Sequence, residues 1–161
     1  MMSEPVKVLN PEEDGITHIN TYTKGKTRLG RLLTNLADIP VTHPKYGMFR
    51  CAEGLWYYMR TGCKYENLRA LTGFDAKKLG VTLEVVWMDD FEEQFKIALR
   101  NKIQSHPELH ELFINSTLPF EHYYFYGSNK PGIAPKVIEP KNVKWLTEFF
   151  TELRGEWRTK E

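Results

Sequence analysis

Two segments of the chain repeat apolar side chains with the period of an α-helix and are polar elsewhere. In residues 89–105 and 142–157 the apolar positions recur three and four residues apart, which is typical of a helix that buries one face. Such a face is stable only when it packs against another element. The chain must therefore fold around a core that both helices cover. The apolar positions are Phe91, Phe95, Ala98, Leu99 and Ile103 in the first segment and Val143, Leu146, Phe149, Phe150, Leu153 and Trp157 in the second.

A third apolar segment, FRCAEGLWYYM at 49–59, predicts a helix that is buried more completely. Its apolar residues again recur three and four positions apart. Glu53 lies beside this apolar stripe and is the acidic residue of the segment. Glycines and prolines, which end and begin helices, bound three further predicted helices at 65–71, 74–79 and 106–116.

Three segments combine β-branched and aromatic residues as strands do, at 19–23, 82–87 and 120–126. Pro and Gly indicate a loop or hairpin at 37–48 and a loop at 128–141. The predicted strands are few and short beside the helices. We therefore expect an α+β fold, a mostly helical single domain with a small β-sheet.

The basic segment KGKTRLGR at 24–31 has two interpretations. It contains four Lys or Arg and two Gly, so it is either a solvated turn or a loop that faces a phosphate. Residues 1–18 are polar and include an acidic run. We expect them to form a flexible arm ahead of a domain at 19–161.

Composition excludes several classes of protein. Of the 161 residues, 41% are apolar, which is enough for a packed core and too many for a disordered chain. The chain has no apolar run near the roughly 20 residues that span a bilayer and no apolar signal segment at its start, so we expect a cytoplasmic protein without a membrane partner. Cys51 and Cys63 are expected to be free thiols.

The charge balance limits how the chain can contact nucleic acid. It has 22 Lys and Arg against 21 Asp and Glu, a net charge of +1. Proteins that bind the nucleic-acid backbone over a wide surface usually have a basic excess. Any nucleic-acid contact of this chain is therefore expected to be local, through a pocket or a patch.

Motifs of the common metal, nucleophile and nucleotide sites are absent from the sequence. It contains no H-E-x-x-H, G-x-S-x-G, G-x-x-x-x-G-K-[ST] or G-x-G-x-x-G. His106 and His110 have the spacing of one helix face, but no further ligand motif accompanies them. We therefore expect neither a metal nor a cofactor.

Two carboxylates in apolar or aromatic surroundings are the candidates for chemistry. Glu53 lies in the segment 49–59, and Glu121 lies in FEHYYFY at 120–126. Two carboxylates around one pocket suit cleavage of a bond to the anomeric carbon of a sugar, which passes through an oxocarbenium-like state. The alternative for Glu53 is a structural ion pair, and the alternative for the neighbouring aromatic residues is core packing.

Taken together and in this order, the segments resemble the NADAR or YbiA-like family over about residues 19–157. A small divergent branch of this family, found in T-even-type phages, has a similar arrangement. The matching segments are Ile19-Asn20-x-Tyr22, Leu33-Thr34-Asn35-Leu36, Ala52-Glu53-Gly54 with Trp56 and Tyr57, Ala76 to Gly80, Trp87, Ala98-Leu99-Arg100-x-Lys102 with His106-Pro107-Glu108-Leu109, Phe120-Glu121-His122, Tyr126-Gly127 and Leu153-Arg154.

The resemblance implies a YbiA-like fold and hydrolysis of an N-glycosidic bond without a metal. The family's substrates are ADP-ribosyl groups on nucleobases, notably guanine in DNA, and phosphorylated ribosyl intermediates of riboflavin synthesis. Carried over by position, the resemblance implies catalytic roles for Glu53 and Glu121 and substrate-binding roles for Asn20, Asn35, Tyr57, Arg60, Trp87 and Tyr126.

The sequence also departs from the family pattern near the implied site. Gly54 stands where the family has His, Tyr57 where it has Gln, and Arg60 where it has Lys. Arginine cannot replace lysine as a base or an amine nucleophile. Three hypotheses follow. The first is an N-glycosidase that removes ADP-ribose, or a related ribosyl phosphate, from a nucleobase. Its candidate substrates include single-stranded DNA that carries the adduct, and its expected role is a phage counter-defence in the host cytoplasm. The others are an inactive ADP-ribose-binding module and an effector that binds a host protein.

Overall fold

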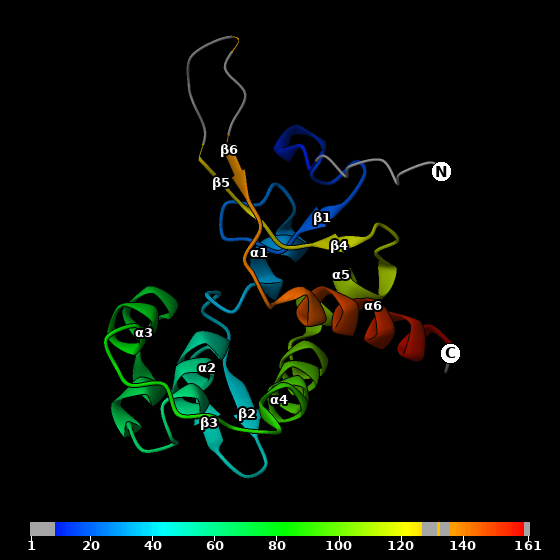
Figure 1. Cartoon of the computed structure of the whole chain (residues 1–161). Coiled ribbons are helices and arrows are strands. Elements are labelled where there is room, and N and C mark those ends of the chain that lie inside the picture. The colour runs from blue at the N-terminus through cyan, green and yellow to red at the C-terminus, as the bar shows by residue number, and fades with distance from the viewer. Residues whose placement is uncertain (1–8, 127–131, 133–135, 160–161) are drawn as a thin grey trace, which may run out of the picture.

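The computed structural model of the chain describes residues 9–126, 132 and 136–159 (Figure 1). The two long amphipathic helices form as the sequence predicts, and the helix expected at 49–59 also forms, with a later start. Elements of the described residues are, in chain order, η1 Pro11–Glu13, β1 Ile19–Asn20, α1 Arg28–Leu33, β2 Val41–His43, β3 Gly47–Phe49, α2 Ala52–Arg60, η2 Glu66–Ala70, α3 Gly73–Gly80, α4 Phe91–Ser105, α5 Pro107–Asn115, β4 Phe120–Glu121, β5 Tyr124–Tyr126, β6 Lys136–Ile138 and α6 Lys144–Thr159.

Helix α4 is central to the packing, since it contacts β2, α2, α5 and α6. Its stripe of Phe95, Ala98, Leu99 and Ile103 is buried, as the periodicity predicts. Helix α6 adds its own buried face to the same core. Helix α5 begins with Pro107, and the His106 side chain caps it by accepting a hydrogen bond from the Leu109 N–H at 3.1 Å.

The strands form three separate pairs, so the described residues contain no single larger sheet. β1 runs parallel to β4, β2 and β3 form an antiparallel hairpin, and β5 pairs with β6 in antiparallel register. The α+β class is confirmed, and so is the hairpin expected at 37–48. Figure 1 shows the β5–β6 pair extending away from the helices.

Three local expectations differ from the structure. The segment 82–87 is not a strand, because no neighbouring strand pairs with it in the described chain. Within the basic segment 24–31, expected as a solvated turn or as a phosphate-facing loop, the Thr27 hydroxyl accepts a hydrogen bond from the Gly30 N–H at 2.9 Å and starts helix α1. The expected strand at 120–126 is interrupted at His122 and Tyr123, where the Tyr123 side chain turns into the core.

The predicted loop at 128–141 is wrong at Lys136–Ile138, which form β6. The expected helix start at Phe49 is also wrong, because Phe49 ends β3 and α2 begins at Ala52. Residues 127–131 and 133–135 of the predicted loop lie outside the described residues.

The expected flexible arm does not extend over its second half. Asp14 is buried, and its carboxylate accepts hydrogen bonds from the backbone N–H groups of Asn20 and Lys26 at 3.0 and 2.8 Å. The buried His18 ring is hydrogen-bonded to the Tyr123 hydroxyl at 2.5 Å. Residues 1–8 of the arm lie outside the described residues.

Two further expectations from the sequence concern the cysteines and membrane-spanning segments. Cys51 and Cys63 are free thiols, as predicted. In the described ranges, no helix is both long and apolar enough to cross a bilayer. The same ranges contain no group of three His, Cys, Asp or Glu side chains arranged to hold a metal ion.

Candidate functional site

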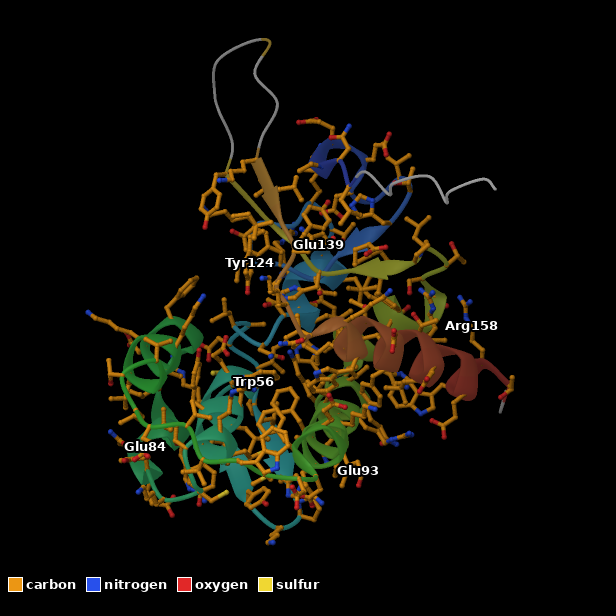
Figure 2. All side chains as sticks on the ribbon, in the orientation of Figure 1. Trp56, Glu84, Glu93, Tyr124, Glu139 and Arg158 are labelled. Atoms are coloured by element: carbon orange, nitrogen blue, oxygen red, sulfur yellow. The ribbon has the colours of Figure 1, made fainter. Side chains whose placement is uncertain are left out.

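Glu53 lies in the first turn of α2 and lines a cavity of about 160 Å³ between the helices and the β5–β6 hairpin. Figure 2 shows two of the walls, Trp56 on α2 and Tyr124 at the base of the hairpin. Asn35 and Tyr57, two other residues expected in the site, line this cavity too. The complete lining is Thr21, Leu33, Thr34, Asn35, Leu36, Glu53, Trp56, Tyr57, Lys77, His122, Tyr124, Pro140, Val143, Leu146 and Phe150.

A backbone hydrogen bond links Glu53 to the segment that follows α1. The Glu53 N–H donates to the Asn35 carbonyl at 2.9 Å. This bond satisfies one of the free N–H groups at the start of α2. It also places the Asn35 and Glu53 side chains on the same cavity, although they are 18 residues apart in the sequence.

Burial dominates the electrostatics of the Glu53 carboxyl group. Desolvation raises its pKa from 4.5 to about 7, while the positive charges of Lys77 and Lys102 act in the opposite direction. In the described part of the chain, the carboxylate accepts no hydrogen bond. Its oxygens are therefore open to a ligand, and the group changes its charge near neutral pH, as acid–base catalysts do.

Lys102 is completely buried behind the cavity. Its ammonium donates hydrogen bonds to the carbonyls of Thr34 at 3.0 Å and Leu33 at 3.4 Å. Burial lowers the pKa of Lys102 to about 7, and the charges of Cys51 and Glu53 oppose that shift. Lys102 thus binds the C-terminal end of α1, whose last residues line the cavity, and also influences the charge of Glu53.

Lys77, His122 and Tyr124 also line the cavity. The Lys77 ammonium lies 5.7 Å from the centre of the Tyr124 ring. The His122 Nδ1 atom lies 2.7 Å from the Thr21 carbonyl oxygen and donates to it. Burial lowers the pKa of His122, and the Lys77 charge lowers it further. The cavity therefore combines a cation, a neutral imidazole and a phenol around one carboxyl group.

Two aromatic residues form the α2 wall. Trp56 stacks in parallel on Trp145 at 6.0 Å and meets the edges of Phe91 and Phe95 at 4.8 and 5.2 Å. Tyr57 packs against the end of α3, where a Cβ atom on Gly80 would lie 2.1 Å from the Tyr57 ring. The absence of a side chain at Gly80 thus allows Tyr57 to line the cavity.

A second cavity of about 520 Å³ lies on the other side of Trp56 and contains two more of the expected site residues, Arg60 and Trp87. The Arg60 guanidinium lies 5.2 Å from the Trp56 ring centre and 5.5 Å from that of Phe91. The Trp87 side chain is 83% exposed, and its indole N–H donates to the Asp89 carboxylate at 2.5 Å. The structure does not bring Arg60 or Trp87 into the Glu53 cavity.

Glu121 lines a third cavity of about 660 Å³ along α6. This cavity shares His122, Pro140 and Val143 with the Glu53 cavity. The two carboxylates expected to act together therefore face neighbouring cavities.

The last two expected residues lie outside all three cavities. Asn20 is fully buried, and its amide donates to and accepts from the Tyr123 backbone at 3.0 Å in each bond. Asn20 therefore holds β1 to the segment between β4 and β5. Tyr126 is 64% exposed on β5.

The packing around Gly54 explains one departure from the family pattern. A Cβ atom at Gly54 would lie 2.6 Å from the Leu68 carbonyl oxygen of η2. No side chain fits there, and a histidine in this position would displace η2 from α2.

The fold and the cavity together define a mostly helical α+β domain with a buried carboxyl group in the first turn of a central helix. A solved structure with this architecture is the NMR structure of the E. coli protein YbiA. It matches with a TM-score of 0.63 and 18% sequence identity, over 95% of this chain and 89% of that chain. No protein-family profile and no curated protein matches the sequence. The likeness is therefore one of fold.

The sequence did not identify four residues at or behind the cavity as site residues: Lys77, Lys102, His122 and Tyr124. For Lys102 a signal existed, because it follows Ala98 and Leu99 by four and three positions on the apolar face of α4. A lysine in such an apolar stripe means either that the predicted helix face is wrong or that the lysine is buried and paired with hydrogen-bonding groups. For the other three residues the sequence holds no comparable signal, because separate elements bring them to the cavity.

Proposed function

We propose that this chain is an N-glycosidase that hydrolyses the bond between a ribosyl group, such as ADP-ribose, and a nucleobase. The main support is Glu53, a partly buried carboxyl group that lines a cavity and accepts no hydrogen bond among the described residues. The YbiA-like fold and the order of the sequence motifs support the same class of reaction.

In the proposed reaction, ionised Glu53 is the general base. It takes a proton from a water molecule whose oxygen bonds to the anomeric carbon of the ribose. The carbon–nitrogen bond breaks, and its electron pair leaves with the nucleobase, which takes up a proton. The negative charge of Glu53 also stabilises the positive charge that develops on the sugar.

The dimensions of the cavity support a ribosyl group as the reacting part. At about 160 Å³ the Glu53 cavity is the smallest of the three cavities, which suits a ribosyl group better than a complete ADP-ribose. In our proposal Asn35 binds the ribose, Trp56 and Tyr57 pack on it, and the rest of the ligand extends out of the cavity beside Lys77 and Tyr124.

The experiment that tests this proposal is a turnover assay with an ADP-ribosylated single-stranded oligonucleotide and mass spectrometry of the released product. Wild type should release ADP-ribose, and Glu53→Gln should not. Glu93→Gln is the matched control, because it makes the same chemical change at the second cavity. Release by Glu53→Gln at the wild-type rate would exclude Glu53 as the catalytic residue.

The biological setting that we propose is reversal of guanine ADP-ribosylation in DNA, as a phage counter-defence in the host cytoplasm. It depends on the enzymatic proposal and on the sequence resemblance. Cells that produce a toxin that ADP-ribosylates DNA should grow when they also produce the wild-type protein, but not when they produce Glu53→Gln. Equal growth with both proteins would contradict this role.

Exposed apolar residues support a second candidate function, binding of a host protein. Val85, Val86 and Trp87 are 65, 42 and 83% exposed on the segment between α3 and α4, and exposed apolar patches are typical of interaction sites. A host protein that co-purifies with wild type but not with Trp87→Ala, without release of ADP-ribose, would favour this function. Stabilisation by ADP-ribose without release would instead favour an inactive binding module.

A further inference from the structure

His122 lies in the short segment between β4 and β5 and lines both the Glu53 cavity and the third cavity. Its Nδ1 atom lies 2.7 Å from the Thr21 carbonyl oxygen. A carbonyl oxygen only accepts hydrogen bonds, so Nδ1 carries the proton and donates it. Burial lowers the pKa of His122 from its ordinary value of 6.5, and the charge of Lys77 lowers it further. The ring is therefore neutral, and its Nε2 atom is a hydrogen-bond acceptor.

The Nε2 atom of His122 accepts no hydrogen bond from the residues that the structure describes. The two polar contacts of the ring in those residues, with the carbonyl and the hydroxyl of Thr21, are both made by Nδ1. No side-chain nitrogen or oxygen of the described ranges is both buried and without a partner, so Nε2 is accessible from outside the protein. The spaces beside His122 are the two cavities that it lines. Nε2 therefore offers a lone pair to a ligand there.

Contacts on two sides fix the orientation of the His122 ring. The Nδ1 bond holds one edge, and the Tyr124 ring packs against His122 at a centroid distance of 5.4 Å and an interplanar angle of 77°. Thr21 is itself held, because its N–H and its hydroxyl both donate to the Glu121 carbonyl, at 2.9 and 3.0 Å. An acceptor in a fixed position selects ligands by where they carry a donor.

Glu53 and His122 line the same cavity of about 160 Å³, so a sugar whose anomeric carbon is next to Glu53 also lies close to His122. The hydroxyl nearest that carbon is the 2′-hydroxyl, which ribose has and deoxyribose lacks. We propose that His122 is a specificity-determining residue, whose Nε2 accepts a hydrogen bond from the 2′-hydroxyl of the bound ribosyl group. The identity of the sugar rests on the proposed function, whereas the selection between two sugars requires no catalysis.

This hydrogen bond distinguishes two N-glycosidic bonds of the same base. A guanine in DNA that carries ADP-ribose is joined to the ribose of the adduct and to the deoxyribose of the strand. Both bonds connect a nitrogen to an anomeric carbon, so a general base such as Glu53 does not by itself distinguish them. Only the ribose of the adduct has a 2′-hydroxyl. A site that requires this hydroxyl directs hydrolysis to the adduct and spares the bond that holds the base in the strand.

The test compares the binding of ribose 5-phosphate and 2-deoxyribose 5-phosphate, measured by isothermal titration calorimetry. Wild type should bind ribose 5-phosphate about tenfold more tightly, because the deoxy sugar leaves Nε2 unpaired in a partly desolvated site. His122→Asn should reduce this preference to less than about twofold, since the asparagine amide reaches the position of Nδ1 but has no atom at that of Nε2. His122→Gln should retain most of the preference, because its amide reaches the position of Nε2. A purely structural role of His122 would weaken the binding of both sugars equally.

His106→Asn is the matched control, because it makes the same change at a histidine that lines none of the three cavities. The His106 ring accepts the hydrogen bond that caps α5, and asparagine is also a favoured cap at this position. This variant should retain the wild-type preference of about tenfold for ribose 5-phosphate.

Three results would overturn the inference: no preference of wild type for ribose 5-phosphate, a preference that persists in His122→Asn, or release of the modified base by wild type with an abasic strand as the product. The wild-type preference is measured without any variant, so it tests the inference even if His122→Asn does not fold. A tenfold preference without release of ADP-ribose would contradict only the proposed function. Release of ADP-ribose without the preference would contradict only this inference.

Discussion

The cavities on the two sides of Trp56 share one wall but place their charged groups differently. In the first, the carboxyl group of Glu53 is desolvated, and burial raises its pKa to about 7. In the second, Asp89, Asp90 and Glu93 are exposed to solvent. Water stabilises an exposed carboxylate, whereas a buried one depends on the few charges around it. The same kind of side chain is therefore suited to catalysis on one side and to solubility or binding on the other.

Arg60 in the second cavity and Lys102 behind the first differ in a corresponding way. Arg60 stacks on aromatic rings in the second cavity, where a guanidinium is permanently charged. Lys102 is buried behind the first cavity, where the pKa of its ammonium is lowered to about 7. Two groups with a pKa of about 7, Glu53 and Lys102, therefore lie in and behind the first cavity, whereas exposed acidic side chains line the second.

The largest difference in turnover is expected between two variants that each remove one carboxylate charge, one from each cavity. Glu53→Gln should reduce the release of ADP-ribose about 1,000-fold, in the range of lost general acid–base catalysis, and should retain ligand binding. Glu93→Gln should change the rate by less than twofold. Product release measured by mass spectrometry and binding measured by thermal stabilisation separate the two effects. Similar losses in both variants would mean that the cavities act as one site.

The two tryptophans should differ strongly in their contribution to stability. Trp56→Ala removes a ring packed among Phe91, Phe95 and Trp145 and should lower the free energy of unfolding by about 3 kcal/mol. Trp87→Ala removes an exposed ring and should lower it by less than about 0.5 kcal/mol. Urea unfolding followed by circular dichroism measures both. A large loss for Trp87→Ala would show that the segment 82–87 supports the core.

The buried carboxyl group should also make stability depend on pH. Because the pKa of Glu53 is about 7 in the folded protein and 4.5 as its ordinary value, the folded state binds an extra proton between these pH values. Glu53 therefore leaves the free energy of unfolding unchanged below pH 4.5. Above about pH 7, its desolvation lowers that free energy by the full amount. Relative to wild type, Glu53→Gln should gain about 3 kcal/mol between pH 4.5 and 8. Equal pH dependence of the two proteins in urea unfolding would mean that Glu53 is solvated.

Substitution of Lys102 should have a smaller effect on turnover. Lys102 does not line the cavity, but its charge influences the pKa of Glu53. Lys102→Met removes a positive charge that favours ionised Glu53, so the pKa of Glu53 should rise above 7. A rise of about one unit would lower turnover at pH 7 roughly fivefold and turnover at pH 9 much less. Titration of Glu53 by ¹³C NMR of its carboxyl carbon tests this without any substrate. An unchanged midpoint would limit Lys102 to a structural role.

How far the sequence predicts the fold depends on the range of the interactions involved. The periodicity of Phe95, Leu99 and Ile103 predicts their burial correctly, because a helix face is set by nearby residues. The segment 82–87 has the composition of a strand, yet no partner strand lies beside it, and pairing depends on distant residues. Thr27 is a cap that the sequence pattern predicts in principle, but the density of basic residues favoured a turn.

The sequence by itself determined the α+β class, the helices α4 and α6, and the presence of Glu53 beside the apolar stripe of α2. The tertiary structure alone decided which residues share a cavity with it. Asn35 lies near Glu53 because one backbone hydrogen bond joins their segments, and Arg60 is held on the far side of Trp56 by aromatic stacking. Periodicity places a side chain on a face of its own element, but a site is formed by several elements, and their packing is set by contacts between residues far apart in the chain.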